Sequence, residues 1–247
     1  MADAHMAVLG VPKEKREALG SSAISSVPMK LLHTAHVPAG DGPFPTLVLL
    51  HGWGASAHDL LGLAPHLQDG EALVLCPQGK VELQVGPGMT GYGWFQLVPG
   101  QPPNVAEFRE RSAELRGWLD EAVERYPVDP KRLAVGGFSQ GGLMAFELGL
   151  REPGRFRGIA ALSTWFPEQL AADLAKLPEH ESLPVLMLHG TEDRMIEVER
   201  ARESRERLRE FGVRLLYREF AMGHEIRPEA LRTLERWLGE KAFAESP

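Results

Sequence analysis

The sequence predicts an α/β fold in which helices cover both faces of a mostly parallel central sheet. Short apolar runs, which suit buried parallel strands, alternate along the chain with longer segments of helical periodicity. We find no internal repeat, no second-domain boundary and no large helical insertion that would form a lid between two strands. With 247 residues, 43% of them hydrophobic, the chain is long enough to bury one sizeable core.

The predicted domain spans residues 28–247, and residues 1–27 are expected to be an N-terminal extension of unknown role. The charged residues 13–17 suit a short solvated helix, and the serine-rich segment at 21–26 has the composition of a linker. Packing on the domain, self-association and disorder all stay open for it.

In the first half of the domain we expect an antiparallel strand over residues 29–37 and a central parallel strand over 46–50. A helix is expected over 57–67, followed by a buried strand over 72–77. Residues 77–103 then form a long loop rich in glycine and aromatic residues. Because loops of this length in compact domains are often functional, it is a candidate part of the site.

In the second half, Asn104 and Glu107 form a capping pair at the start of a helix that runs from Val105 to Tyr126. A strand then runs into Ser139, and a helix follows it. Glu203 and Arg207 are spaced for an ion pair on a later helix. The remaining expected elements are strands at 158–162, 183–190 and 213–220, and helices at 197–210 and 228–242.

The segment Gly137-Phe138-Ser139-Gln140-Gly141 lies between a predicted strand and a predicted helix. In that context the pattern G-x-S-x-G predicts a nucleophile elbow, a turn so tight that the two glycines cannot carry side chains. The serine hydroxyl is then exposed above the amino end of a helix, which favours a developing negative charge. The alternative is a glycine-rich loop that contains a serine by chance, and the partners of Ser139 decide between the two.

A serine nucleophile needs a base that a carboxylate orients. Downstream of Ser139 the aspartates are Asp173, in a helical pattern, and Asp193, in the loop after a buried strand. Only one histidine, His224, follows Asp193, and it also lies in a loop after a strand. The order Ser139, Asp193, His224 is that of the catalytic triad in the α/β-hydrolase fold, which we therefore predict.

The strand over residues 46–50 ends in His51-Gly52-Trp53-Gly54, the place from which this fold takes its second oxyanion donor. We predict an oxyanion hole made of the backbone N–H groups of Trp53 and Gln140, with His51 bracing the loop. No third ligand lies at metal spacing from His51 and His58, so no metal site is expected there.

The substrate pocket is expected to involve aromatic and apolar residues near the predicted strand ends. For the first two of them, anchoring of the long loop in the core is an equally good interpretation. The candidates are Trp94, Phe95, Trp165, Phe166, Met195 and Ile196.

A formal net charge of −7 disfavours a nucleic-acid partner and stable association with an anionic membrane. No run of eighteen apolar residues exists, and the N-terminus is a poor secretory signal. The single cysteine, Cys76, is expected to be buried and suits a reducing compartment. We therefore expect a cytoplasmic protein whose partner is a small-molecule ester, and a homodimer stays open.

The sequence resembles the carboxylesterase/phospholipase family of α/β-hydrolases, which includes bacterial carboxylesterases and acyl-protein thioesterases. The resemblance spans roughly residues 45–240 and implies a cofactor-free serine esterase with the same three triad residues. The matching segments are Leu50-His51-Gly52-x-Gly54, Gly136-Gly137-Phe138-Ser139-Gln140-Gly141-Gly142, His189-Gly190-Thr191-Glu192-Asp193 and Gly223-His224.

Two departures from the family pattern concern the substrate side. Trp53 replaces a small aliphatic residue, and the acid common after Gly54 is missing. Gln96 stands where family members often carry an acid after Trp-Phe. Specificity for lipids or acylated proteins is therefore not carried over to this chain.

The predicted function is hydrolysis of carboxylic esters through an acyl-enzyme intermediate. Without a lid insertion the site is expected to be open, which favours short-chain or aryl esters. The alternatives are a thioesterase, lysophospholipase or peptidase with the same triad, or a non-catalytic binding protein on a hydrolase fold, because fold alone does not imply function.

Overall fold

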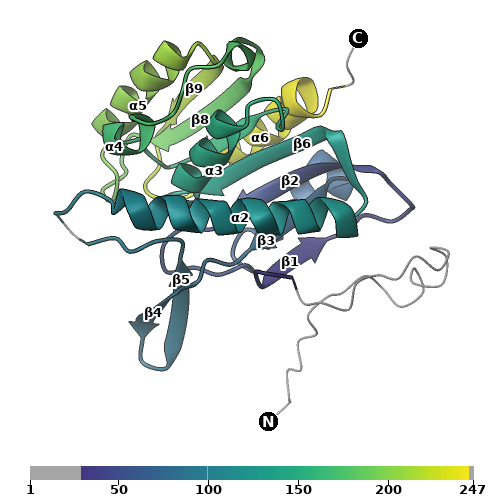
Figure 1. Cartoon of the computed structure of the whole chain (residues 1–247), viewed down its shortest axis with the longest axis horizontal. Helices are drawn as coiled ribbons and strands as arrows, with labels where there is room; N and C mark the ends of the chain where they lie inside the picture. The colour runs from purple at the N-terminus through teal and green to yellow at the C-terminus, as the bar shows by residue number, and fades with distance from the viewer. Residues whose placement is uncertain (1–28, 99, 245–247) are drawn as a thin grey trace.

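The computed structural model describes residues 29–98 and 100–244, so the predicted extension over residues 1–27 lies outside the described residues. A sheet of seven strands forms the centre, in the order β1-β3-β2-β6-β7-β8-β9 (Figure 1). Strand β1 is antiparallel to β3, and every other neighbouring pair is parallel. The strands are β1 (His33–His36), β2 (Phe44–Leu50), β3 (Leu73–Pro77), β6 (Val128–Phe138), β7 (Ile159–Leu162), β8 (Pro184–Gly190) and β9 (Arg214–Phe220).

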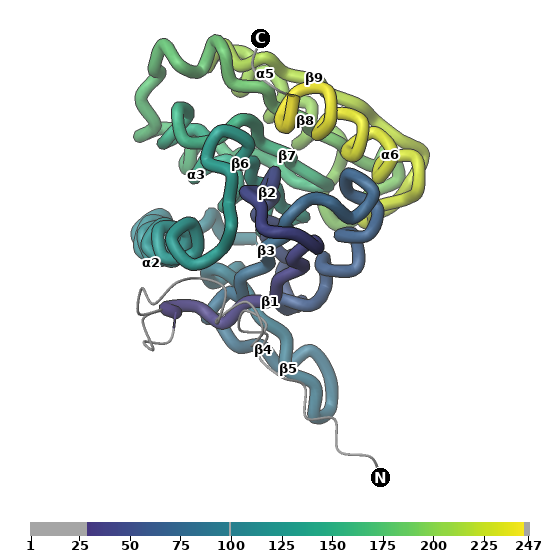
Figure 2. The backbone as a smooth tube through the Cα atoms, turned by 90° about the vertical axis from the view of Figure 1, so that its right-hand side faces the viewer, coloured from purple at the N-terminus to yellow at the C-terminus, as the bar shows by residue number. Residues whose placement is uncertain are grey.

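Helices cover both faces of this sheet, and the buried apolar residues form one cluster on each face. Along β2, Val48 and Leu50 pack on the face covered by α2, α3 and α5, whereas Leu47 and Leu49 pack on the face covered by α6. Figure 2 shows α2 and α3 on one side of the strands and α6 on the other. The helices are α2 (Val105–Arg125), α3 (Gln140–Arg151), α4 (Glu168–Ala171), α5 (Val198–Phe211) and α6 (Pro228–Trp237), with the 3₁₀ turns η1 (Leu61–His66), η2 (Gln68–Gly70) and η3 (Pro178–Ser182) and the π-helical turn η4 (Leu238–Ala242).

Several predicted elements are confirmed. Asn104 Oδ1 accepts a hydrogen bond from the Glu107 backbone N–H at 3.2 Å and so caps α2. Glu203 and Arg207 form an ion pair of 3.9 Å on α5. The predicted strands at 46–50, 72–77, 158–162, 183–190 and 213–220 all lie in the parallel part of the sheet.

Two predicted elements are wrong. The helix expected over residues 57–67 is only the short 3₁₀ turn η1, because Gly62 and Pro65 lie inside the segment and disfavour an α-helix. The long loop over 77–103 contains an antiparallel hairpin of β4 (Val81–Gly86) and β5 (Met89–Gly93), which projects from the sheet in Figure 1.

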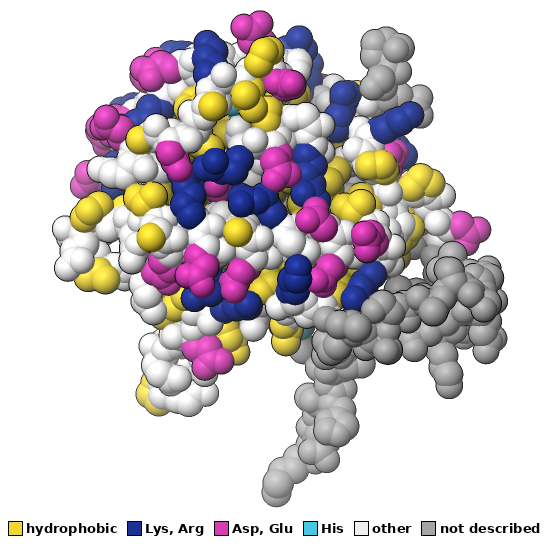
Figure 3. All heavy atoms as spheres, viewed as in Figure 1, with side chains coloured by type: hydrophobic (Ala, Val, Ile, Leu, Met, Phe, Trp, Pro, Cys, Tyr) yellow, Lys and Arg dark blue, Asp and Glu magenta, His cyan; other side chains and the backbone are white. Residues whose placement is uncertain are grey.

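The face crossed by α2 carries side chains of both charge signs, interspersed in Figure 3. Beneath them Glu147 of α3 is buried and forms ion pairs with Arg109, Arg116 and Arg151. These contacts tie α2 to α3, the helix that follows the predicted nucleophile, and a buried carboxylate needs such partners.

Cys76 is buried in β3 and only 2% exposed, as expected. Burial raises the pKa of its thiol to about 12, so the thiol stays protonated at neutral pH. Among the residues that the structure describes, no helix is long and apolar enough to cross a membrane.

Candidate active site

Ser139 lies at the tip of the turn between β6 and α3, in the strained backbone conformation that the elbow requires. Its φ is 54° and its ψ −118°. The backbone N–H of Ser139 donates to the carbonyl of Leu162 at 2.9 Å, and its carbonyl accepts from the Thr164 hydroxyl at 2.7 Å. A Cβ on Gly137 or Gly141 would overlap neighbouring backbone atoms, which explains why both positions lack side chains.

Asp193 and His224 follow β8 and β9, and the structure brings them together. His224 Nδ1 lies 2.8 Å from Asp193 Oδ2. The other carboxylate oxygen accepts backbone hydrogen bonds from Met195 and Ile196, both at 2.9 Å. Because an ionised carboxylate only accepts, Nδ1 carries the proton, and Nε2 is left free to act as a base.

The His224 ring lies beside the nucleophile elbow. Its centroid is 4.8 Å from the ring centroid of Phe138, the residue before Ser139. Parallel strands end at the same edge of a sheet, so the loops after β6, β8 and β9 meet there. The structure thus collects the three predicted triad residues at one edge, with a hydrogen bond between two of them.

His189 is a further buried histidine in this region, to which we assigned no role from the sequence. Its Nε2 donates to the carbonyl of Ile196 at 2.8 Å and lies 3.6 Å from Asp193 Oδ2. Burial lowers the pKa of His189, so the ring is neutral near pH 7. The sequence does contain a signal for this contact: His189 lies at the end of a predicted strand, four residues before Asp193.

The predicted oxyanion donors come from two segments beside Ser139. A Cβ on Gly52 would lie 3.4 Å from the Cβ of Ser139, so the loop after β2 runs along the elbow. Gln140 is the first residue of α3, and its amide therefore has no acceptor within its own helix. In the part of the chain that the structure describes, neither the Trp53 nor the Gln140 backbone N–H donates a hydrogen bond.

His51 braces this loop through both ring nitrogens. Nε2 accepts a hydrogen bond from the Gly79 backbone N–H at 3.0 Å, so Nδ1 carries the proton and donates to the carbonyl of Gly52 at 2.8 Å. The ring stacks on Trp94 with centroids 5.0 Å apart. Burial lowers the pKa of His51, and the neutral ring serves as a structural bridge.

The structure corrects most of the predicted pocket residues. Trp94, Phe95, Phe166 and Ile196 are at most 4% exposed and offer almost no surface to a substrate. Trp94 and Phe95 lie in the hydrophobic core, as the alternative interpretation of these two residues proposed. Half-buried Trp165 and the exposed Met195 remain candidates for the pocket wall.

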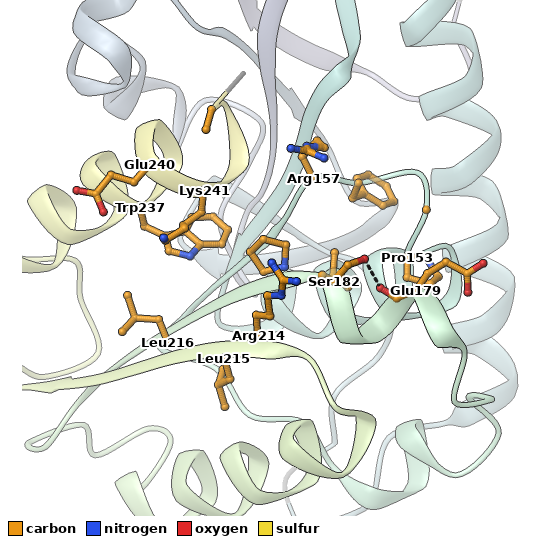
Figure 4. A pocket seen from close by; sticks show the side chains of 15 residues that line it. Pro153, Arg157, Glu179, Ser182, Arg214, Leu215, Leu216, Trp237, Glu240 and Lys241 are labelled. Carbon is orange, nitrogen blue, oxygen red and sulfur yellow. Dashed lines mark hydrogen bonds between the residues drawn. The ribbon is translucent and has the colours of Figure 1, made fainter. Parts of the chain in front are cut away.

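A cavity with a volume of about 760 Å³ lies at the opposite edge of the sheet. Its lining includes Pro184 and Arg214, the first residues of β8 and β9, together with Arg157 and Trp237 (Figure 4). The triad residues follow the carboxyl ends of their strands, so this cavity is separate from the candidate active site.

Comparisons with known proteins show the family and the fold of this chain. The family described as Phospholipase/Carboxylesterase matches residues 33–241. Acyl-protein thioesterase 1 of Gibberella zeae is 27% identical over 217 residues, which cover 81% of this chain and 92% of that protein. The corresponding protein of Mycosarcoma maydis is 26% identical over 221 residues, again 81% of this chain and 92% of the relative.

Two solved structures share the fold. Esterase PE8 superposes with a TM-score of 0.72 at 25% identity, covering 84% of this chain and 97% of that one. A Bacillus cereus carboxylesterase gives a TM-score of 0.71 at 22% identity, covering 91% and 98%. The predicted α/β-hydrolase fold is confirmed. This chain belongs to the phospholipase/carboxylesterase family, whose members are serine hydrolases of the carboxylesterase and acyl-protein thioesterase type.

Proposed function

We propose that this protein hydrolyses carboxylic esters through an acyl-enzyme formed on Ser139. The observation that carries the proposal is the 2.8 Å hydrogen bond between Asp193 Oδ2 and His224 Nδ1. The His224 ring also packs against Phe138 of the nucleophile elbow. Such a hydrogen bond fixes the imidazole tautomer that can take a proton from a serine hydroxyl, and the carboxylate stabilises the imidazolium that results.

Two proton transfers complete the cycle. His224 Nε2 takes the proton from Ser139 Oγ as that oxygen bonds to the carbonyl carbon of the ester. When the tetrahedral intermediate collapses, His224 returns the proton to the leaving alcohol, and the acyl group stays on the serine. A water molecule deprotonated by His224 then releases the carboxylic acid and restores Ser139.

The oxyanion of each tetrahedral intermediate is held by the backbone N–H groups of Trp53 and Gln140. Both amides lie next to Ser139 in space or in sequence and have no acceptor among the described residues. Gln140 also begins α3, whose N-terminal end favours negative charge. Donors of this kind stabilise charge that appears only during the reaction.

The proposed substrates are short-chain or aryl esters, because no large insertion separates the described strands above the triad. Met195, 75% exposed two residues after Asp193, and half-buried Trp165 supply the apolar surface that an acyl group would contact. Faster turnover of acyl chains longer than about ten carbons than of butyrate would contradict this substrate range.

The proposal is tested with p-nitrophenyl esters of increasing chain length, on the native protein beside Ser139→Ala. We expect the native protein to exceed the variant by on the order of 10⁴-fold or more in kcat. Equal background rates would overturn the enzymatic function and leave a binding protein on a hydrolase fold.

A thioesterase is the second candidate function, because the relatives in Gibberella zeae and Mycosarcoma maydis are named acyl-protein thioesterase 1. The triad chemistry accepts a thiolate leaving group as readily as an alkoxide. Parallel measurements of kcat/KM on an oxoester, a thioester, a lysophospholipid and an amide with the same acyl group separate these activities.

The remaining proposals concern partners and location. A small-molecule ester as the partner, without nucleic acid or stable membrane association, is supported by the net charge of −7 and by the interspersed charges of Figure 3. The single buried thiol supports a cytoplasmic location. Size-exclusion chromatography with light scattering tests the homodimer.

A further inference from the structure

The side chains of Trp53 and Gln140, whose backbone amides are the proposed oxyanion donors, converge on one glycine. A Cβ on Gly93 would overlap the Trp53 ring and would lie 3.3 Å from Gln140 Oε1. Gly93 ends β5, in the hairpin that the sequence did not predict. The end of this hairpin is therefore wedged between the two segments that supply the donors.

The side-chain amide of Gln140 forms hydrogen bonds with the chain just after β5 through both its oxygen and its nitrogen. The side chain is fully buried. Its Oε1 accepts a hydrogen bond from the Trp94 backbone N–H at 2.8 Å, and its Nε2 donates to the carbonyl of Phe95 at 2.6 Å. The donor on one partner and the acceptor on the other fix the orientation of the amide.

The loop that carries Trp53 is joined to the same hairpin. Gly54 N–H donates to the carbonyl of Tyr92 at 2.8 Å, and Tyr92 N–H donates to the carbonyl of Ala55 at 2.8 Å. A Cβ on Gly91 would overlap the carbonyl of Gly54, so the two backbones are in close contact. Residues 91–95 thus hold the loop after β2 on one side and the start of α3 on the other.

We propose that the Gln140 side chain is a positioning group, which sets the spacing of the two oxyanion donors by clamping them to residues 92–95. The inference rests on the proposed function. The donors belong to separate segments, and a preorganised pair of amides stabilises an oxyanion only when both are held at hydrogen-bond distance from it. Loss of the clamp therefore weakens binding of the transition state and leaves ground-state binding of the ester unchanged.

The first test is Gln140→Met, which keeps the length of the side chain and removes both hydrogen bonds. We expect kcat to fall by about tenfold to a hundredfold, less than the loss of a whole donor, with KM within about twofold of the native value. Gln84→Met is the matched control, because Gln84 lies exposed on β4 of the same hairpin and should leave both constants unchanged.

A readout specific to the oxyanion hole is the inhibition constant of a trifluoromethyl ketone. Ser139 Oγ adds to its carbonyl carbon, the serine proton passes to His224, and the ketone oxygen becomes an alkoxide in the hole. For Gln140→Met the inhibition constant should rise by the same factor by which kcat/KM falls. Rates are normalised to the folded fraction measured by circular dichroism.

Gly93→Ala is the second variant and decides the matter if Gln140→Met does not fold. Its new methyl group would overlap the Trp53 ring and would crowd Gln140 Oε1 at 3.3 Å, so it pushes the Gln140 side chain and the loop after β2 apart, and the same pattern is expected. The proposal is overturned if the folded variants keep native kcat and inhibition constants, or if the rate loss occurs without weaker inhibition. A native protein no faster than Ser139→Ala would instead overturn the proposed function itself.

Discussion

The two sides of the nucleophile differ in how they are built. On the acid–base side, Asp193 and His224 lie in short loops directly after neighbouring strands, and backbone N–H groups close by hold the carboxylate. On the oxyanion side, the loop after β2 depends on a hairpin some forty residues downstream. The comparison teaches that the proposed acid–base pair is held by loops of the central sheet itself, whereas the proposed oxyanion donors are held by a hairpin outside that sheet.

Asp193→Asn should give the largest loss of activity, since it changes the acid–base side. An amide at this position no longer fixes the His224 tautomer with a free Nε2, and kcat should fall by about 10⁴-fold. Hydrolysis of p-nitrophenyl butyrate measures it. The control is Asp173→Asn, because Asp173 is exposed, lies just after α4 and forms ion pairs with Arg109 and Arg151. A similar loss in both variants would contradict the assignment of the acid.

Gly91→Ala tests the oxyanion side. The new methyl group would overlap the carbonyl of Gly54 and displace the hairpin from the oxyanion loop, so kcat should fall by about tenfold or more. Gly86→Ala is the matched control in the same hairpin, because its Cβ meets only the Met89 side chain, at ordinary contact distance. If the two alanines behave alike, the hairpin does not support the oxyanion hole.

The pH dependence of stability tests how His189 contributes to the acid–base side. Burial lowers its pKa below the ordinary value of 6.5, so the folded state favours the neutral ring. Above pH 6.5 both states are neutral there. As the pH falls below 6.5 toward the lowered pKa, the unfolded state binds more protons and the free energy of unfolding decreases, by up to about 1.4 kcal/mol per pH unit for one proton.

His189→Asn should therefore lose less free energy of unfolding than the native protein between about pH 6.5 and pH 5. Urea titrations at a series of pH values measure this difference. His58→Asn serves as the control, since His58 is exposed and should leave the native pH dependence intact. Parallel curves for the native protein and His189→Asn would show that His189 is not kept neutral by folding.

The smallest effect is expected from Met195→Ala, which removes exposed apolar surface next to the acid. The free energy of unfolding should change by less than about 0.5 kcal/mol. KM for hexanoate esters should rise by about threefold, because part of the acyl contact is lost, while KM for acetate esters stays the same. Equal changes for both esters would place Met195 outside the acyl pocket.

The parallel strands, and the strand ends near which the three candidate triad residues lie, could be predicted from the sequence because their signals are local. An apolar run such as Leu47–Leu50 suits a strand covered on both faces, and Asp193 comes shortly after a run of this kind. His224 comes shortly after the alternating strand over residues 213–220. The hairpin was missed although the alternation from Val81 to Val85 carries a strand signal, because Gly and aromatic residues beyond it suggested a loop.

The prediction that buried aromatic residues line the substrate pocket was wrong for a different reason. An aromatic side chain after a strand can point toward solvent or into the core, and only the packed structure decides which. Phe95 packs edge-on against Phe108 of α2, and Phe166 packs against Phe146 of α3. Neither partner lies close in the sequence, so no local pattern could have predicted these contacts.

The strained backbone at Ser139 implies that the chain loses stability at the proposed nucleophile. A φ of 54° suits glycine much better than serine, and neighbouring hydrogen bonds hold the residue there. Ser139→Gly should therefore yield an inert protein that melts at a higher temperature than the active one. Thermal tolerance and turnover would then be opposed at a single position of the chain.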